Sequence, residues 1–303
     1  MQHGFTYEAA LEASQRVNWR LEDVIGGDKR LDFARPFMPE SLARVAPLDF
    51  LDAAEARLLN QIRGHGYLYL FGTVEEFILP FVMDHARPQL HGDDARIRAL
   101  LQFAAEEAKH IHLFKQFRAE FRAGFGVECG VIGPPQEIAR HVLAHHPLGI
   151  ALVILHLEWM TQRHWVDSIH DDGGLDPQFK SLLRHHWMEE AQHAKVDTLT
   201  IEAMVAACSA SDVAAGIADY AAIGGFLDDG LRQQAELDTA SFERAVGRKL
   251  GGRERSRMIE GQHQAMRWTF LGSGMTHPRF LDTLGQIDPA ARRQVETMAQ
   301  NLC

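Results

Sequence analysis

Apolar residues recur at helical spacing along almost the whole chain. Between residues 49 and 87 they fall three or four positions apart, from Leu51 through Leu58 and Phe71 to Val82. This spacing places apolar side chains on one face of an α-helix, whereas a half-buried strand would alternate them. The same pattern predicts further long helices over 95–122, 147–171 and 177–210, and shorter ones over 136–144, 213–235, 239–249, 252–273 and 288–301. The sequence therefore predicts an all-α fold.

Capping residues mark the ends of these helices. Asp93 stands directly before the second long helix, and Asp176 followed by Pro177 is typical of an N-cap and first turn. Three glycines between residues 64 and 72, together with Pro80, interrupt the first long helix. We expect a bend or a close backbone approach there.

Composition narrows the class of protein. The chain has 303 residues, of which 46% are hydrophobic, and its 41 acidic side chains against 31 basic ones give a net charge of −10. This balance is typical of a globular protein with a substantial core and excludes a disordered chain. The acidic excess argues against a nucleic-acid partner, because such a partner requires a basic surface.

Cysteine usage and the amino-terminal residues bear on the compartment. Cys129, Cys208 and Cys303 lie far apart and form no CxxC pair, which excludes a disulfide framework and a thiolate zinc cluster. The first twenty residues resemble neither a signal peptide nor a transit peptide. The most apolar run, residues 147–157, is too short to span a bilayer. We expect a cytoplasmic protein with no membrane partner.

One local motif occurs twice, because residues 106–110 and residues 189–193 both read EEAxH. A glutamate and a histidine three positions apart lie on the same helix face, so each motif offers one carboxylate and one imidazole. The pairs are Glu107 with His110 and Glu190 with His193. A single copy usually means a solvated glutamate beside a surface histidine, but two copies on separate long helices indicate the dimetal site of a ferritin-like bundle.

Such a site needs one further carboxylate from each of the other two long helices. Glu158 follows an apolar run, where an isolated carboxylate would cost several kcal/mol unless it were paired or metal-bound. On the first helix, Glu75 shares the face of the core stripe that contains Phe71, whereas Glu76 shares a mixed face with Tyr69. We favour Glu75 as the ligand and keep Glu76 as the alternative.

His186 extends the second motif, because it precedes Glu190 by four positions and lies on the same helix face. It is a predicted seventh ligand, and the alternative is a core or surface histidine. Glu106 and Glu189 are either exposed or accept a hydrogen bond from the ring N–H of a ligand histidine. Three other histidines are expected to pack or to lie outside the ligand set: His112, His156 and His164.

The two EExxH motifs resemble those of ferritin-like diiron proteins. The added His186 resembles the p-aminobenzoate N-oxygenase family, whose members oxidise arylamines with O2 at a diiron site. The resemblance covers about residues 50–205 and implies seven protein ligands to two irons. They are two bridging carboxylates, two terminal carboxylates and three imidazoles, namely Glu107 and Glu190, Glu75 and Glu158, and His110, His193 and His186.

We therefore expect a ferritin-like four-helix bundle over residues 48–210, with an N-terminal helical arm over 1–47 and a C-terminal helical extension over 211–303 packed on the bundle. The expected function is a non-haem diiron oxygenase that uses O2 to oxidise a small organic substrate, in the specific form of N-oxygenation of an amine. Two iron ions are the expected cofactors, and manganese is an alternative for the same donors. No catalytic residue beyond the metal ligands and no flavin or ferredoxin fingerprint stands out. An external electron donor is therefore expected, and a homodimer is left open.

Two other functions use the same ligands. One is a ferroxidase or iron-storage protein, although almost a hundred residues follow the bundle and suit a cover or a dimer interface better than a cage. The other is a radical-generating diiron subunit, which needs an oxidisable tyrosine near the metals. Tyr67 and Tyr69 lie about two turns from Glu75, too far along the helix for that role.

Two groups of residues have a functional and a structural interpretation. Five aromatic residues near the ligands either line a substrate pocket or belong to the core: Phe71, Phe103, Phe114, Trp159 and Trp187. Arg267 either binds a substrate carboxylate or forms a salt bridge between helices. We favour the structural interpretation in both cases.

Overall fold

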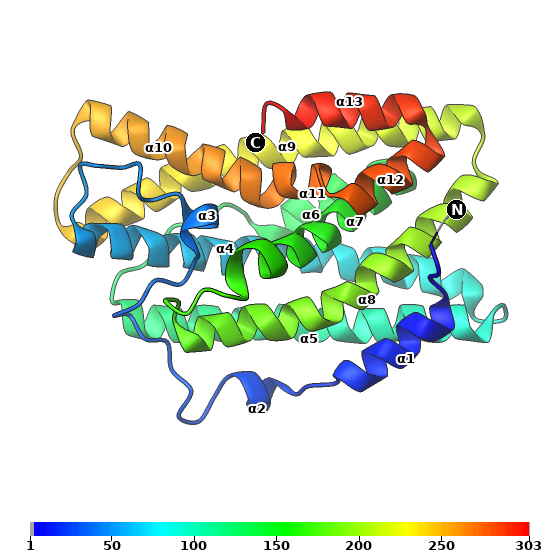
Figure 1. The fold of residues 1–303 in the computed structure, drawn as a ribbon, viewed down its shortest axis with the longest axis horizontal. Coiled ribbons are helices and arrows are strands. Elements are labelled where there is room, and N and C mark those ends of the chain that lie inside the picture. The colour runs from blue at the N-terminus through cyan, green and yellow to red at the C-terminus, as the bar shows by residue number, and fades with distance from the viewer. Residues whose placement is uncertain (1–2, 303) are drawn as a thin grey trace.

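Four long helices carry the fold, as seen in the computed structural model, which describes residues 3–302 (Figure 1). They are α4 (Ala53–Ala86), α5 (Asp94–Phe125), α7 (Pro147–His164) and α8 (Pro177–Ala207). α4 packs along α5, α7 packs along α8, and α5 contacts α8. No strand occurs in the described range, so the predicted all-α class and four-helix bundle are confirmed.

Shorter helices and one further long helix surround this bundle. They are α1 (Tyr7–Val17), α2 (Leu21–Val24), α3 (Glu40–Ala43), η1 (Arg87–Gln89), α6 (Pro135–Leu143), η2 (Trp165–Ile169), α9 (Ala210–Val246), α10 (Gly252–Arg267), η3 (Trp268–Gly272), α11 (Ser273–Met275), α12 (Pro278–Ile287) and α13 (Pro289–Ala299). α1 packs on α5 and α8, while α9 packs on α7 and α4 and supports α10. Figure 1 shows α1 and α2 along one side of the bundle and α9, α10 and α13 along the other.

The predicted caps are present at the helix starts. The Asp93 carboxylate accepts hydrogen bonds from the first backbone N–H groups of α5, and Asp176 accepts one from Phe179 at the start of α8. These bonds satisfy donors that a helix start leaves without a partner. α5 ends at Phe125 and is capped by Gly126, whose φ of 80° is the left-handed conformation that glycine adopts readily.

The prediction of two helices over 213–235 and 239–249 was wrong, because α9 is continuous from Ala210 to Val246. Asp238 and Thr239 are weak helix formers, and a break was expected there. Instead, the Asp238 carboxylate turns into the protein toward Arg63, and the Thr239 hydroxyl donates to the Ala235 carbonyl at 2.8 Å. Thr239 thereby has a partner inside the continuous helix, and Asp238 has one on α4.

The close backbone approach expected in the first long helix is confirmed. At Gly64 a Cβ atom would lie 2.9 Å from Cβ of Phe37, and at Gly66 it would lie 3.4 Å from the Asp238 carboxylate. α4 nevertheless remains one helix through Pro80. The glycines therefore let neighbouring segments pack directly against its backbone.

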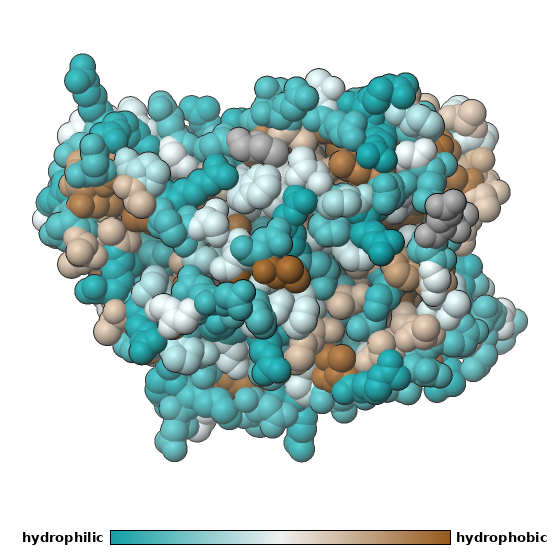
Figure 2. Space-filling view, in the orientation of Figure 1, coloured by the Kyte–Doolittle hydropathy of each residue, from teal (hydrophilic) through white to brown (hydrophobic). Residues whose placement is uncertain are grey.

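One hydrophobic core includes residues from every part of the chain, among them Val24, Leu152 and Phe280, which are fully buried. The division at residues 47 and 210 stays a prediction. The stretch Ala53–Gln89 is long and apolar enough to cross a membrane, but 67% of its most apolar window is buried inside the protein. On the face shown in Figure 2, hydrophobic side chains are scattered among hydrophilic ones.

Candidate metal centre

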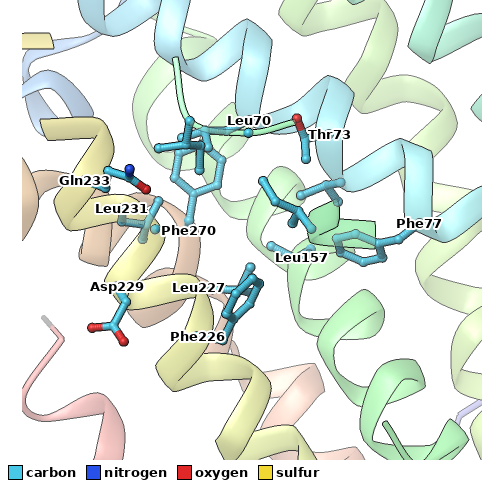
Figure 3. Close-up of a pocket in the computed structure, with 15 residues that line it drawn as sticks. Leu70, Thr73, Phe77, Leu157, Phe226, Leu227, Asp229, Leu231, Gln233 and Phe270 are labelled. Atoms are coloured by element: carbon cyan, nitrogen blue, oxygen red, sulfur yellow. The ribbon is translucent and has the colours of Figure 1, made fainter. Parts of the chain in front are cut away.

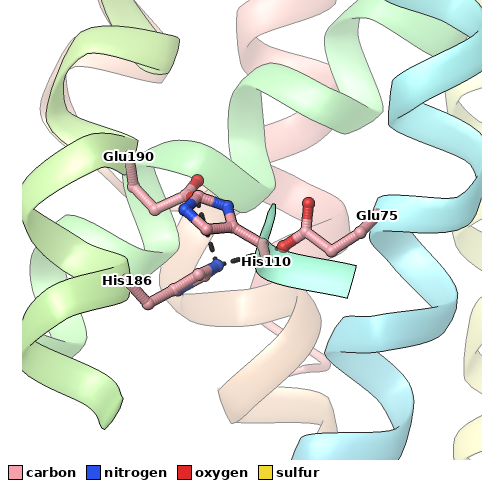
Figure 4. Close-up of side chains that lie close together, drawn as sticks. All are labelled: Glu75, His110, His186 and Glu190. Atoms are coloured by element: carbon pink, nitrogen blue, oxygen red, sulfur yellow. Dashed lines mark hydrogen bonds and ion pairs between the residues drawn. The ribbon is translucent and has the colours of Figure 1, made fainter. Parts of the chain in front are cut away.

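The bundle helices bring seven carboxylate and imidazole side chains together in the interior. They are Glu75 on α4, Glu107 and His110 on α5, Glu158 on α7, and His186, Glu190 and His193 on α8. None of these side chains is more than 3% exposed. Figure 4 shows Glu75 extending from α4 toward His186 and Glu190 on α8, with the imidazole of His110 beside them.

The side chains form two adjacent groups of four, and each group can hold one metal ion. The groups are Glu75, His110, His186 and Glu190, and Glu107, His110, Glu190 and His193. Within each group the potential ligand atoms lie within 4.8 Å of one another. Because His110 and Glu190 belong to both groups, the two positions are neighbours, as a dimetal site requires.

Short distances define each position. Nε2 of His186 lies 3.0 Å from Oε1 of Glu75 and 3.0 Å from Oε1 of Glu190. Nδ1 of His193 lies 2.8 Å from Oε1 of Glu107. Nδ1 of His110 lies 3.0 Å from Oε1 of Glu190. The carboxylate of Glu190 thus stands between the two positions.

Many of the inward-facing atoms make close contacts but no well-directed hydrogen bond within the described part of the chain. They are Oε2 of Glu75, both oxygens of Glu107 and Glu158, Oε1 of Glu190, and Nδ1 of His110 and His193. A buried polar atom without a partner is strongly destabilising, and a buried carboxylate more so. The set consists only of oxygen and imidazole nitrogen atoms, which are the ligands that iron, manganese and zinc accept.

Glu158 lies beside this set but outside both groups of four. Its carboxyl is 1% exposed, and its pKa is raised well above the ordinary value by burial and then by the negative charge of Glu190. Two carboxylates held this close in the interior cannot both ionise readily without a cation between or beside them. A bound cation would remove the repulsion.

Proton affinities in the ligand set reflect the same shortage of positive charge. Burial alone would lower the pKa of His110. Its contacts with the carboxylates of Glu189 and Glu190 outweigh burial and raise the pKa to about 9. The pKa of His193 is also raised well above its ordinary value, by Glu190 and Glu106 against burial. The protonated imidazoles balance the buried carboxylates, and metal ions can replace those protons.

A second layer of carboxylates holds the histidines, and it crosses between the two motifs. Nε2 of His110 lies 2.8 Å from Oε2 of Glu189, and Nε2 of His193 lies 2.9 Å from Oε2 of Glu106. Each ring therefore donates its Nε2–H outward and presents Nδ1 to the interior. Glu106 and Glu189 were expected either to be exposed or to accept a hydrogen bond from a ligand histidine. Both residues are buried, and each accepts such a hydrogen bond.

The structure separates Glu75 from Glu76. Glu75 is 2% exposed and faces the ligand set. Oε1 of Glu76 instead lies 3.1 Å from Nζ of Lys115 at the surface. Metal coordination by any of the seven side chains stays a prediction. Glu76, the alternative to Glu75, is directed away from the rest of the set.

Sequence reasoning missed the residues that support the outer carboxylates. Nζ of Lys109 lies 2.5 Å from Oε1 of Glu189 and 3.9 Å from the centre of the Trp19 ring. Trp19 in turn stacks on His110, with ring centres 6.1 Å apart and planes 11° apart. Lys109 occupies the variable position of the first EEAxH motif. A lysine next to a ligand histidine was the only feature of the sequence that could have indicated this support.

The predicted aromatic residues divide by location. The Phe103 ring stacks on His193 at 3.9 Å, and Phe71 and Phe114 meet His186 edge-on at 5.3 and 5.0 Å. These three pack around the histidines as core residues. Trp159 stacks on His277, and Trp187 stacks on Trp165, so neither ring faces the ligand set.

The remaining predictions resolve into structural contacts. His156 and His164 are buried and hydrogen-bond to the C-terminal segment, to the Phe270 carbonyl at 3.1 Å and to the Ser273 hydroxyl at 3.0 Å. His112 is exposed. Arg267 forms a two-point salt bridge with Asp228, at 2.7 and 2.6 Å, which is the structural alternative.

No family model and no curated protein matches the chain. Among solved structures, it is similar to R2-like ligand-binding oxidases. A Tyr-to-Phe variant with an aerobically reconstituted Mn/Fe cofactor gives 14% identity and a TM-score of 0.47, over 87% of this chain and 92% of that chain. A Gly-to-Leu variant with an Fe/Fe cofactor gives 15% identity and a TM-score of 0.46, over 86% and 91%. The interpretation of the site therefore rests on its own geometry.

Proposed function

We propose that this protein is a non-haem diiron oxygenase that uses O2 to oxidise a small organic substrate. The observation that carries the proposal is the convergence of unpartnered carboxylate oxygens and Nδ1 atoms on two adjacent positions in the dry interior of the bundle. A buried set of this composition is stable only if cations or protons neutralise it. Two cations side by side match the two groups of four.

The donor set supports iron. Carboxylates outnumber imidazoles by four to three, and iron accepts such a mixture of oxygen and nitrogen ligands. Manganese accepts the same donors and is the alternative cofactor. Glu75, Glu107, Glu158 and Glu190 would hold the ions through carboxylate oxygen, and His110, His186 and His193 through nitrogen. Two ferrous ions held here would supply electrons for the reduction of O2.

Neighbouring side chains would orient the ligands and limit the access of water to the ions. Glu189 and Glu106 accept hydrogen bonds from Nε2 of His110 and His193, which leaves both Nδ1 atoms directed inward, where they would bind the ions. The rings of Phe71, Phe103 and Phe114 exclude water from the imidazoles. Exclusion of water protects reactive oxygen from unproductive side reactions.

The specific reaction we propose is N-oxygenation of an amine, and it rests on the resemblance to the p-aminobenzoate N-oxygenase family. One oxygen atom of O2 replaces an N–H bond by N–OH, and the other leaves as water. The balance requires two electrons and two protons, and we propose that the electrons come from an external donor. We further propose a cytoplasmic location, no nucleic-acid or membrane partner, and a homodimer.

Iron content is the decisive measurement. The full chain is loaded anaerobically with excess ferrous iron, exposed to air and desalted. We expect about two irons per chain, as in other dimetal carboxylate bundles, and a sharp fall in Glu107→Ala and Glu190→Ala. Dozens of irons per chain would instead establish iron storage, and no retained iron would refute a diiron site.

One observation favours radical generation as a second candidate. Tyr67 is buried, its ring lies 4.5 Å from that of Phe71, and its pKa is raised by burial and then by the charge of Glu190. It is thus closer to the ligand set than its position along α4 indicated. The double variant Tyr67→Phe and Tyr69→Phe should leave an oxygenase active, whereas complete loss of an O2-derived radical would support radical generation.

A further inference from the structure

Two short N-terminal helices and the link between them lie across one side of the candidate metal centre. α1 packs on α5 and α8, the two helices that carry the EEAxH motifs, and α2 contacts α8. Figure 1 shows α1 and α2 along this side of the bundle, with α9 and α10 along the other. The Ser14 hydroxyl of α1 donates to Oε2 of Glu106 at 3.3 Å, so this segment reaches the outer carboxylate of one motif. We call residues 7–24 the strap.

Trp19, in the link between the two helices, reaches the other motif. Its ring lies nearly parallel to the imidazole of His110, with ring centres 6.1 Å apart and planes 11° apart. Nζ of Lys109 lies 3.9 Å from the centre of the same ring and 3.2 Å from the Trp19 carbonyl oxygen. That ammonium group also lies 2.5 Å from Oε1 of Glu189. Trp19 is 5% exposed and the Lys109 side chain 19%, so on this side one ring and one ammonium group cover the imidazole.

The strap has few buried residues to hold it in place. Three of the eleven residues of α1 are buried, namely Ala10, Leu11 and Ser14. Nε1 of Trp19 is buried and makes no hydrogen bond within the described residues, which costs free energy in the closed arrangement. Segments with little buried surface open locally at a lower free energy than the core does. We therefore expect the strap to open while the four-helix bundle stays folded.

The closed molecule gives a metal ion no path to the ligand set. None of the seven side chains is more than 3% exposed, and α9 and α10 cover the side of the bundle away from the strap. Opening of the strap would withdraw the Trp19 ring from His110 and remove two of the contacts that hold Lys109 in place. The Glu189 carboxylate would then face solvent with less positive charge beside it, which attracts a divalent cation.

We propose that the strap controls the entry and exit of metal ions at the candidate metal centre, with Trp19 as the residue that closes it. The proposal rests on the proposed diiron function. In the closed strap, Trp19 covers His110 and holds the ammonium group of Lys109 beside Glu189, where its charge repels an approaching cation. In the open strap, the cover and the charge leave together. Trp19 is thus a positioning residue and binds no metal itself.

Rates of iron exchange test the strap. The full chain is mixed with ferrous iron without O2, and a coloured ferrous chelator reports the free iron over time; excess chelator added to the loaded protein gives the release rate. Trp19→Ala should raise both rates by about tenfold or more, because loss of a buried aromatic ring weakens packing by at least that factor. A weakened ligand set would release iron faster without taking it up faster. An unchanged uptake rate in Trp19→Ala would therefore overturn the proposal.

Two further variants isolate the role of Trp19. Trp19→Phe keeps a ring over His110 and should exchange iron at close to the rates of the unmodified protein. Trp165→Ala is the matched control, because Trp165 is also 5% exposed but stacks on Trp187, away from the strap. It should leave the uptake rate unchanged. Uptake as fast in Trp165→Ala as in Trp19→Ala would mean that any loss of packing opens the centre, and it would overturn the proposal.

Hydrogen exchange measures the opening of the strap directly. In metal-free Trp19→Ala the backbone amides of α1 should exchange faster by the same factor as iron uptake, and those of α9 should not change. Faster uptake without faster exchange in α1 would place the entry route elsewhere and overturn the proposal. Ser14→Ala removes the bond to Glu106 and should raise uptake and α1 exchange together by a smaller factor, so the test stands if Trp19→Ala does not fold.

The outcomes separate the strap from the function on which it rests. An unmodified protein that binds no iron would refute the proposed diiron function and the strap with it. Iron bound by all variants at equal rates would refute the strap alone and leave the diiron centre in place.

Discussion

Glu189 and His110 belong to different EEAxH motifs, yet Oε2 of Glu189 accepts a hydrogen bond from Nε2 of His110 at 2.8 Å. Glu106 and His193 repeat the relationship in the opposite direction at 2.9 Å. The first glutamate of each motif therefore orients the histidine of the other. This exchange ties α5 to α8 at the candidate metal centre.

Glu189→Gln should weaken iron binding. The amide cannot balance charge on His110 and holds its ring orientation less firmly, and loss of such an outer partner typically costs 10–100-fold in metal affinity. Competition with a ferrous chelator measures the affinity. Glu76→Gln, which alters a surface ion pair with Lys115, is the control and should bind iron as the unmodified protein does. Equal affinities in both variants would show that Glu189 does not orient a ligand.

Glu75→Ala and Glu76→Ala distinguish the two adjacent carboxylates. Glu75 is buried 3.0 Å from Nε2 of His186, whereas Glu76 faces Lys115 at the surface. Iron retained after reconstitution should fall from about two per chain to one or fewer in Glu75→Ala and stay unchanged in Glu76→Ala. The opposite result would assign the first ligand to Glu76 and require α4 to rotate when metal binds.

The sequence was sufficient to predict which residues share a helix face, because that depends only on their spacing along one helix. Glu107, His110, Glu190 and His193 stand at fixed spacing within one helix face, and that geometry depends only on the helical repeat. The burial of Glu158 followed from its apolar neighbours in the same way. Helix starts at Asp93 and Asp176 were likewise predicted from the local capping chemistry.

Features that depend on contacts between helices were out of reach. The crossed pairs of Glu106 with His193 and Glu189 with His110 exist because α5 and α8 pack side by side, which no spacing within one helix encodes. Trp19 reaches His110 from a segment 91 residues earlier in the chain. An apolar cavity of about 310 Å³ draws its walls from α4, α6, α7, α9 and η3 (Figure 3), so its position required the packed fold.

Buried His156 should make the protein less stable in acid. Its Nδ1 faces the Tyr220 hydroxyl at 3.2 Å and its Nε2 faces the Phe270 carbonyl at 3.1 Å, while burial lowers its pKa to about 4. The unfolded chain, with an ordinary histidine pKa near 6.5, then binds more protons than the folded protein between about pH 6.5 and 4. Stability is present above this window and is lost as the pH falls through it.

Urea unfolding at about pH 7.5 and about pH 5.5 measures this effect. His156 alone should lower the free energy of unfolding by about 1.4 kcal/mol between the two conditions. In His156→Gln the difference between the two conditions should shrink by that amount, whereas the exposed His112→Gln should leave it unchanged. An unchanged difference in His156→Gln would mean that the folded protein accepts a proton on this ring.

Gly274→Ala should destabilise the contact between α11 and α7. A Cβ atom at residue 274 would lie 2.3 Å from the backbone oxygen of His156 and 3.0 Å from its carbonyl carbon, and neither backbone atom can turn away. Overpacking of this kind typically costs 1–3 kcal/mol in the free energy of unfolding, which urea titration measures. Gly225→Ala is the matched control, because Gly225 lies within α9 with open space around it. That control should stabilise by about 0.5–1 kcal/mol through the higher helix propensity of alanine. A Gly274→Ala protein as stable as the unmodified one would show that α11 can move away from α7, and the packing of η3 and Phe270 beside the cavity would then be adjustable.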